Sequence, residues 1–411
     1  MTQLDLAYTR AQFPAFGEPS LAGQAFFENA GGSYPCRQVV DRLTRFYRQR
    51  KVQPYAPYAV SELAGAEMDE AQARLAALMG VAGDEVSFGP STSANTYVLA
   101  QAFRGWLRPG DAIVVTNQDH EANSGVWRRL AADGIRVLEW QIDPETGHLP
   151  LQALPALLDQ GAKLVCFPHC SNVVAEINPV AEIVALAHAA GAVTCVDGVS
   201  YAPHGLPDVA ALGADIYLFS AYKTYGPQQG IMVIRRPLGE ALPNQGHSFN
   251  GGSLYKRFTP AGPDHAQIAA CAGIADYIDD SYRHHFSAEV DPAARGRAMH
   301  DLMRGAEIAR TQPLLDYLAA RNDLRLIGPR VAQARAPTVA VLLDRAAEPV
   351  ARALASYGIN CGGGDFYAVR PLTAMGIDLE QGVLRMSFVH YTSGDEVERL
   401  IRALDQVLAA G

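Results

Sequence analysis

Short aliphatic runs alternate with longer amphipathic stretches through the middle of the chain. The runs are rich in Val, Ile and Leu and are too short for helices, which is typical of strands buried on both faces of a sheet. The stretches between them repeat their apolar residues with a helical period. The predicted strands cover residues 112–116, 163–167, 192–196, 215–219 and 230–234, and the predicted helices cover residues 92–105, 120–132, 179–190 and 207–213.

This alternation predicts a mostly parallel sheet with helices on both of its faces. One connection differs from the others. Residues 220–229, which separate two of the predicted strands, are too few for a crossover helix. One of those two strands is therefore expected to run antiparallel to its neighbour.

The pattern changes near residue 257, within the Gly- and Pro-rich stretch NGGSLYKRFTPAGPD. The elements predicted after it are a helical region over 263–320, strands near 323–327 and 336–343, a helix over 347–357, a strand over 383–389 and a helix over 394–409. The sequence therefore predicts an α/β fold with a large domain (31–257) and a smaller C-terminal α+β domain (258–411). The N-terminal segment (1–30) is expected to pack near the small domain.

Polar residues follow several of the strands, at the point where each strand ends. Ligands of open α/β sheets bind outside the carboxyl ends of the strands, so we expect these residues to line one pocket. They are Ser91, Thr92 and Ser93 after a strand-like run at 84–88, His120 after 112–116, Asn172 after 163–167, Asp197 after 192–196, and Ser220, Tyr222 and Lys223 after 215–219.

Composition narrows the chemistry of this pocket. Only four of the 411 residues are lysines, and Lys223 is the only one at the end of a predicted strand. A partly buried amine has a lowered pKa and suits covalent bonding to a carbonyl carbon. The formal net charge of −9 argues against a protein that binds nucleic acid or an anionic membrane surface.

The apolar stretches and the cysteines bear on the cellular location of the protein. No stretch is long enough to span a bilayer and no signal peptide is evident, so we expect a cytoplasmic protein. The six cysteines are scattered and are expected to be reduced, mostly buried thiols. Cys166 and Cys170 bracket His169, but no second pair completes a zinc site, and no metal is expected.

Four groups at this edge of the sheet have complementary chemistry. Lys223 offers an amine, and Asp197 on the neighbouring strand suits the protonation of a pyridine nitrogen. Residues 91–93 open a helix, where free N–H groups and the positive end of the dipole favour a phosphate. His120 offers a planar ring for stacking. Together these are the requirements of pyridoxal 5′-phosphate.

Four segments of the chain resemble the class V aminotransferase family, in its cysteine desulfurase-like branch. They are FFENAGGSYP near the start, DHEANSGVW, the long segment from SNVVAEINPV through VDGVSYAPHG to LFSAYKTYGPQQG, and VLRMSFVHYTSGDEVERL near the end. They occur in the family's order and cover nearly the whole chain. The resemblance implies a pyridoxal-phosphate enzyme of fold type I, a homodimer with its active sites at the subunit interface.

The resemblance also implies roles for individual residues. The catalytic residues would be Lys223, which forms the internal aldimine, Asp197, which pairs with the pyridine nitrogen, and His120, which stacks on the ring. The other cofactor-binding residues would be Ser91, Thr92, Ser93, Asn172, Ser200, Ser220 and Tyr222, with Thr92, Ser93 and Ser220 on the phosphate. The substrate-binding residues would be Asn29, Asn172, Tyr367 and Arg385, with Arg385 on the α-carboxylate.

The chain departs from the family's pattern at several positions. Ser200 stands where the family commonly has Gln, Tyr222 where it often has His, and Ala261-Gly262 where it usually has a Gly-Thr pair. The stretch GGGDFYA puts Tyr367 where desulfurases carry their active cysteine, after a glycine triplet expected to form a flexible turn. Tyr367 would be a general acid, a gate or a packing residue, and Cys361 is either a replacement nucleophile or a small buried residue.

These observations predict a pyridoxal-phosphate enzyme that acts on a small amino acid through a lysine aldimine and removal of the Cα proton. A desulfurase-like lyase or transferase without the standard cysteine is favoured. The alternatives are an epimerase or an aminotransferase on the same scaffold, and a protein that binds the cofactor without turnover.

Overall fold

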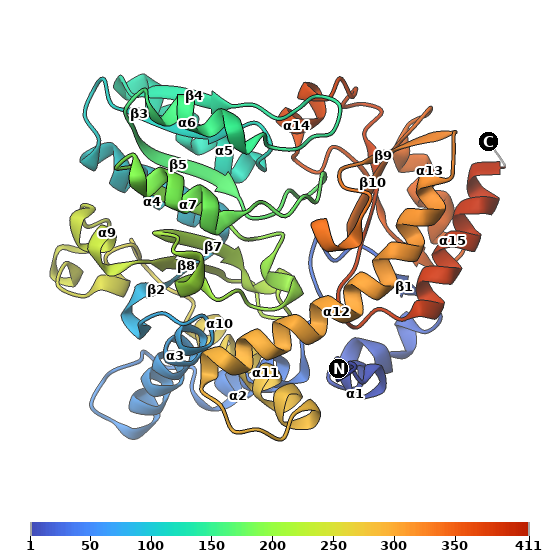
Figure 1. Cartoon of the computed structure of the whole chain (residues 1–411). Helices are drawn as coiled ribbons and strands as arrows, with labels where there is room; N and C mark the ends of the chain where they lie inside the picture. The colour runs from blue at the N-terminus through green and yellow to red at the C-terminus, as the bar shows by residue number, and fades with distance from the viewer. Residues whose placement is uncertain (1, 410–411) are drawn as a thin grey trace.

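The computed structural model describes residues 2–409, and its central feature is a seven-stranded sheet of strand order β2-β8-β7-β6-β5-β3-β4 (Figure 1). The strands are β2 (Val86–Gly89), β3 (Ala112–Thr116), β4 (Arg136–Trp140), β5 (Ala162–Pro168), β6 (Val193–Asp197), β7 (Ile216–Ser220) and β8 (Gly230–Ile234). β8 runs antiparallel to β7 and β2, and the other neighbouring pairs are parallel. The predicted α/β fold is confirmed, including the antiparallel step after residue 219.

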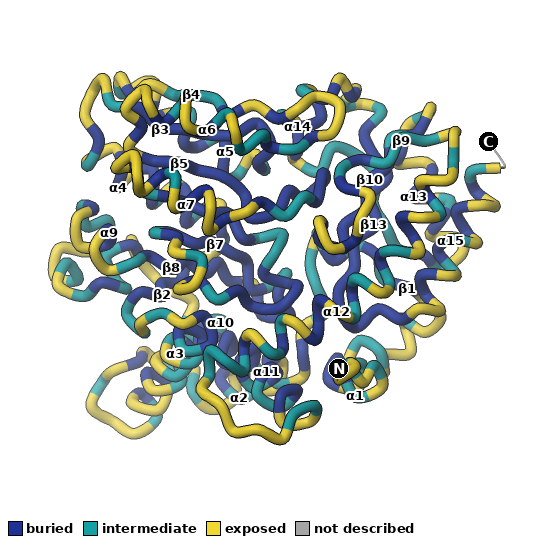
Figure 2. Tube along the Cα trace, viewed as in Figure 1, coloured by how far each residue is buried: buried dark blue, intermediate teal, exposed yellow. Residues whose placement is uncertain are grey.

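Both faces of this sheet are buried, because successive side chains of a strand point to opposite faces. Ile113 and Val115 of β3 belong to one hydrophobic core and Val114 to another. The strands accordingly lie as a buried layer inside the molecule (Figure 2). The helices associated with the sheet are α4 (Thr92–Trp106), α5 (Glu121–Arg128), α6 (Leu154–Leu158), α7 (Val180–Ala189), α8 (Val209–Leu212) and α9 (Arg236–Ala241).

Three local predictions differ from the structure. Edge strand β4 was not predicted, because most of its side chains are partly exposed and carry no buried aliphatic run. The helix predicted over 120–132 ends at Arg128 and continues as a 3-10 turn that Gly134 closes with φ +80°. The helical region predicted over 263–320 is divided into α10 (His265–Ala270), α11 (Ala272–His285) and α12 (Pro292–Ala319). Pro292 suits the first turn of α12, where its missing N–H is not needed.

A second, antiparallel sheet of order β12-β13-β10-β9 has its own hydrophobic core. Its strands and helices are β9 (Leu324–Ile327), β10 (Thr338–Leu343), β12 (Gly362–Gly364), β13 (Val383–Ser387), α13 (Ala347–Ala355), α14 (Val369–Ala374) and α15 (Gly394–Ala409). The glycine triplet expected to be a flexible turn is therefore strand β12. A side chain at Gly363 would collide with α13, because its Cβ would lie 2.5 Å from the backbone of Ala347.

The N-terminal segment contacts this smaller unit. It contains α1 (Leu6–Ala11) and β1 (Ala25–Phe26), and β1 pairs in parallel with β11 (Ile359–Asn360). Arg10 forms an ion pair of 2.6 Å with Glu396 on α15. These contacts bring residues 5–30 next to the small sheet.

Helices α10 and α11 pack against α2 (Arg37–Gln49) and α3 (Ala59–Leu78), on the side of the large sheet. The long helix α12 begins beside α11 and ends beside the small sheet (Figure 1). The predicted domain division near residue 257 stays a prediction. The packing favours a division within α12, since α10 and α11 share the core of the large unit.

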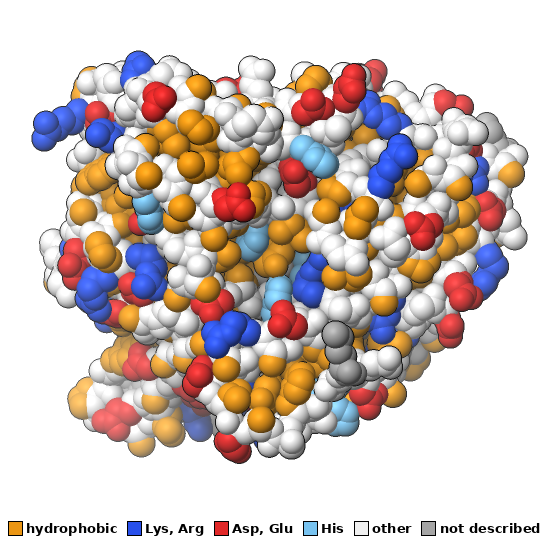
Figure 3. All heavy atoms as spheres, viewed as in Figure 1, with side chains coloured by type: hydrophobic (Ala, Val, Ile, Leu, Met, Phe, Trp, Pro, Cys, Tyr) orange, Lys and Arg blue, Asp and Glu red, His pale blue; other side chains and the backbone are white. Residues whose placement is uncertain are grey.

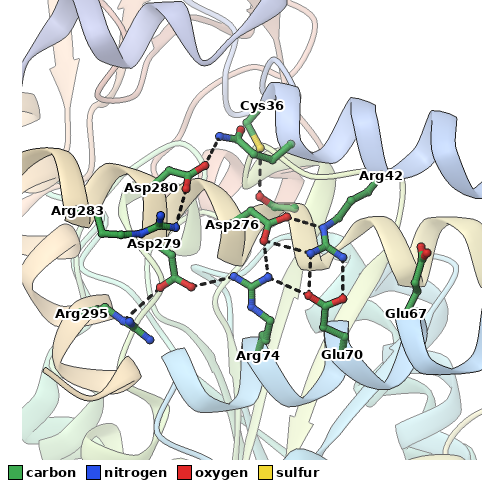
Figure 4. A network of polar contacts seen from close by, with 12 residues as sticks. Cys36, Arg42, Glu67, Glu70, Arg74, Asp276, Asp279, Asp280, Arg283 and Arg295 are labelled. Carbon is green, nitrogen blue, oxygen red and sulfur yellow. Dashed lines mark hydrogen bonds and ion pairs between the residues drawn. The ribbon is translucent and has the colours of Figure 1, made fainter. Parts of the chain in front are cut away.

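An ion-pair network joins α2, α3 and α11 (Figure 4). Arg42 on α2 forms ion pairs with Glu70 on α3, at 2.7 Å, and with Asp276 on α11, at 2.5 Å. Arg74 on α3 contacts the same two carboxylates and also Asp279. The Arg42 guanidinium is nearly buried, and its removal would leave Glu70 and Asp276 paired with Arg74 alone.

We expect Arg42→Ala to lower the free energy of unfolding by about 2 kcal/mol, less than for a fully buried pair because Glu70 and Asp276 keep contact with water. The measurement is equilibrium unfolding in urea. The matched control is Arg45→Ala on the same helix, whose ion pair with Glu67 is more exposed and is worth about 0.5 kcal/mol. Equal losses in the two variants would contradict this account of the network.

Charged side chains of both signs are spread over the visible surface. On the face shown in Figure 3, acidic and basic side chains are interspersed without a large patch of one sign. Among residues 2–409, none of the helices has the length and apolar character needed to cross a bilayer. The same residues contain no cluster of three His, Cys, Asp or Glu side chains suited to a metal ion.

Candidate active site

A cavity of about 620 Å³ lies at the carboxyl ends of the parallel strands, between the large and the small sheet. Loops after β3, β5, β6 and β7 line one side of it, and residues of the smaller unit line the other. The predicted site residues that line it are Ser91, Thr92, Ser93, His120, Asn172, Asp197, Ser200, Ser220, Tyr222, Lys223, Tyr367 and Arg385.

Asn29 is the exception, because it does not line this cavity. Its side chain is buried and accepts a hydrogen bond of 2.8 Å from the Tyr391 hydroxyl, beside the cavity rather than at its mouth. The neighbouring Glu28 and Ala30 line the cavity instead. The FENAGG motif thus contributes to the site, but through a different side chain.

The first turn of α4 forms one end of the cavity. Ser91 caps the helix by accepting the backbone N–H of Ala94, and the Thr92 and Ser220 hydroxyls lie 2.8 Å apart. Gly230 lets the strand β8 pass directly beneath this turn, since a Cβ there would lie 2.4 Å from the Ser91 carbonyl carbon. Hydroxyl groups and unpaired backbone N–H groups at a helix N-terminus favour an anion.

Lys223 follows β7 in a short 3-10 turn (Ala221–Lys223) and contributes its amine to the cavity. Burial, with a further contribution from the positive charge of Arg385, lowers the pKa of Lys223 to about 8. Asp197 ends β6, the strand next to β7, and accepts the backbone N–H of Val199 at 2.8 Å. Burial raises the pKa of Asp197 to about 6.

His120 caps α5 and presents a neutral ring. Its Nδ1 accepts the backbone N–H of Ala122 at 3.1 Å, which requires the ring proton to sit on Nε2. Burial, then the charges of Lys223 and Arg385, lower the pKa of His120 to about 4. A neutral, partly exposed ring in a cavity wall is suited to stacking on a flat ligand.

Asp119 is a second buried carboxyl in the cavity wall that the sequence did not single out. It accepts hydrogen bonds from the backbone N–H of His120, at 2.9 Å, and from the side-chain amide of Asn123. Burial, followed by the nearby charge of Asp197, raises the pKa of Asp119 well above its ordinary value. This shift favours the neutral carboxyl over the charged carboxylate.

Arg385 on β13 was expected to be free to receive a carboxylate, but the structure pairs it with Glu28 at 2.6 Å. Its Nη1 also donates to the backbone oxygen of Asn172 at 3.3 Å, and its guanidinium lies 3.8 Å from the centre of the Phe366 ring. Neither Glu28 nor Phe366 could be identified from the sequence, because both reach Arg385 from segments distant in the chain.

The loop after β12 closes over the cavity. Phe366 and Tyr367 are both in the left-handed region, with φ +53° and +56°, which strains residues other than glycine. The strain is offset by hydrogen bonds: the side-chain amide of Asn172 donates to the Phe366 oxygen, and the Glu121 N–H donates to the Tyr367 oxygen. The Tyr367 ring remains 72% exposed, with its centre 5.6 Å from that of His120.

The thiols near this site are poor nucleophiles. Cys170 lines the cavity, and burial raises its pKa to about 12. Cys361 does not line the cavity, and burial raises its pKa to about 12 as well. A reactive cysteine has the opposite shift, because the thiolate is the attacking species.

Comparison with known proteins identifies a family that matches most of the chain. The model of the family described as Aminotransferase class-V matches residues 25–269 and 298–400. The aminotransferase-like protein FGM3 of Gibberella zeae is 30% identical, and a cysteine desulfurase of Serratia proteamaculans is 29% identical. Each alignment covers 97% of this chain and 97% of the relative.

Solved structures show the same fold. The cysteine desulfurase of Thermococcus onnurineus NA1 superposes with a TM-score of 0.86 at 23% identity, covering 100% of both chains. A cysteine desulfurase of Escherichia coli superposes with a TM-score of 0.83 at 24% identity, covering 99% of both chains. The fold is therefore that of fold-type-I pyridoxal-phosphate enzymes.

Class V aminotransferases and cysteine desulfurases depend on pyridoxal phosphate, and the residues around the cavity fit that cofactor. The cavity combines an amine of lowered pKa, a buried carboxyl on the adjacent strand and hydroxyls at a helix N-terminus. Its volume also leaves space for a small substrate. The chain belongs to the class V aminotransferase family, within its cysteine desulfurase-like branch.

Proposed function

We propose that this protein is a pyridoxal-phosphate enzyme that removes the Cα proton of a small amino acid and carries out a lyase or transferase reaction without a persulfide. One observation carries the proposal: Lys223 and Asp197 line the same cavity as the first turn of α4, while no thiol with a lowered pKa does. When bound, the cofactor supplies an aldehyde for amines and a ring that takes up negative charge from Cα.

Lys223 would hold the cofactor through its amine and then serve as the base for the Cα proton. A pKa of about 8 suits both tasks, because a sizeable fraction of the amine is unprotonated near neutral pH. Asp197 would keep a proton on the pyridine nitrogen. Its burial excludes water and strengthens that interaction.

The other site residues would position the reactants. Ser91, Thr92, Ser93 and Ser220 would bind the phosphate, and His120 would stack on the ring as a neutral imidazole. Ser200 and Tyr222 line the cavity beside Lys223 and would contact the cofactor. Asn172, Arg385 and Tyr367 would contact the substrate.

The experiment that tests the proposal is a screen of amino acids against the purified holoenzyme by visible absorption, with products identified by mass. We expect at least one small amino acid to shift the absorption band and to be converted. Product identity distinguishes elimination from amino transfer and epimerisation, which the same residues support. If no amino acid shifts the band, the protein binds the cofactor without turnover and the proposal fails.

The protein is expected to be a poor cysteine desulfurase. Sulfide release from cysteine in the presence of a reductant should stay at the level of free cofactor, because both thiols nearest the site have raised pKa values. Cys361→Ala should leave that rate unchanged. Rapid sulfide release that is lost in Cys361→Ala would overturn this expectation and make Cys361 the nucleophile.

The family is generally dimeric, and a homodimer with sites at the subunit interface stays a prediction for this chain. The cytoplasmic location also stays a prediction.

A further inference from the structure

In the corner of the cavity around Arg385, the carboxylate of Glu28 pairs with the guanidinium. Glu28 reaches Arg385 from the N-terminal segment, 357 residues away in the chain, and its Oε1 lies 2.6 Å from Nη2. The positive charge that a substrate carboxylate would meet is therefore already balanced by a negative one. A second negative charge brought to this corner is repelled by Glu28 as well as attracted by Arg385.

Two glycines, Gly31 and Gly362, lie close to the Glu28 carboxylate. A Cβ at Gly31 would lie 2.9 Å from Oε1 of Glu28, and a Cβ at Gly362 would lie 2.9 Å from Oε2. A side chain at either glycine would require the end of the Glu28 side chain to shift. The Phe366 ring, which lies against the Arg385 guanidinium, also borders Gly362. The Glu28 carboxylate therefore lies between Gly31, Gly362 and the Arg385 guanidinium.

Three buried polar atoms of this corner have no hydrogen-bond partner. They are the acceptor Oε2 of Glu28, the acceptor Oδ1 of Asn172 and the donor Nε of Arg385. Asn172 is 5% exposed and Arg385 3% exposed, so water does not freely satisfy them. Buried polar atoms without partners are costly, and a ligand that pairs with all of them gains that free energy. The complementary ligand presents one acceptor and two donors.

We propose that Glu28 is the specificity-determining residue of this site and selects amino acids whose side chain carries a neutral or basic hydrogen-bond donor. This inference rests on the proposed function and names its substrate class. The substrate carboxylate accepts from Arg385, and hydroxyl or amino groups of the substrate donate to Glu28 and Asn172. Acidic side chains are rejected by the Glu28 charge, and aliphatic ones leave its Oε2 unpaired.

The test uses three carboxylic acids that lack the amino group and therefore cannot react with the cofactor: 3-hydroxypropionate, propionate and succinate. They offer a carboxylate with a hydroxyl, with no further group and with a second carboxylate. Dissociation constants are measured by calorimetric titration of the purified protein. We expect 3-hydroxypropionate to bind about tenfold more tightly than propionate, because a site built for a donor rejects the analogue lacking it. Succinate should bind weakest.

Glu28→Gln keeps an acceptor but removes the charge, so succinate should bind about tenfold more tightly than to the parent protein. Glu28→Ala, which also removes the charge, provides a second reading of the succinate constant if the glutamine variant folds poorly. Glu398→Gln, the same change at an exposed glutamate paired with Arg402, is the matched control and should alter none of the constants.

Binding of succinate to the parent protein as tightly as 3-hydroxypropionate would overturn the assignment, and so would an unchanged succinate constant in both Glu28 variants. These outcomes are separate from failure of the proposed function. The binding corner belongs to the chain itself, so the order of the three acids is measurable even if Lys223 does not carry the cofactor.

Discussion

Lys223→Ala is expected to abolish covalent attachment of pyridoxal phosphate and to lower turnover by at least about a thousandfold. Lys223 is the only lysine of the chain that lines the cavity, so no other amine is placed to replace it. The variant should fold normally, because it removes a cation whose burial is itself unfavourable.

The measurement is the mass of the intact protein after borohydride reduction, together with its visible absorption band. The parent protein should retain the cofactor after reduction and the variant should not. Lys163→Ala, a change at an exposed lysine near the start of β5, is the matched control and should behave as the parent. A Lys223→Ala protein that still gains the mass of the cofactor would contradict the assignment.

Asp197→Asn is expected to keep the cofactor attached while lowering turnover by about a hundredfold to ten-thousandfold. The amide is isosteric with the carboxyl and accepts the same hydrogen bond from Val199, so the local structure should persist. It has no charge, however, and cannot hold a proton on the pyridine nitrogen. The charge developing at Cα of the substrate then loses its stabilisation.

Asp119→Asn is the matched control for this variant. Asp119 is also buried in the cavity wall, but burial and the charge of Asp197 keep its pKa raised well above the ordinary value. This shift favours the neutral carboxyl, and an amide resembles that form. Turnover of the control should fall far less than that of Asp197→Asn. Equal losses in the two variants would contradict the assignment of this role to Asp197 specifically.

Much of the fold follows from local patterns in the sequence. The five predicted strands are all present, and the antiparallel placement of β8 follows from the short connection before it. The weakest predictions concern elements stabilised by distant contacts. Edge strand β4 lacks a continuous apolar run, and β12 consists of glycines that have no intrinsic preference for a strand.

The sequence by itself determined which side chains gather at the cavity on the large-sheet side. Parallel strands end at one edge of the sheet, so residues that directly follow the strands are expected to lie close together. Lys223, Asp197, His120 and residues 91–93 all line the cavity. The scarcity of lysine then left one candidate for the amine. No tertiary information was needed, because the sheet converts sequence order into spatial proximity.

The smaller unit's contribution was decided only by the tertiary structure. Glu28 and Arg385 are 357 residues apart, and the sequence around either residue does not predict their ion pair. The left-handed backbone at Phe366 and Tyr367 is stabilised by hydrogen bonds to Asn172 and Glu121, and the burial of Asn29 depends on Tyr391. Such contacts depend on how the two sheets pack together, and the periodicity of a single segment carries no information about that packing.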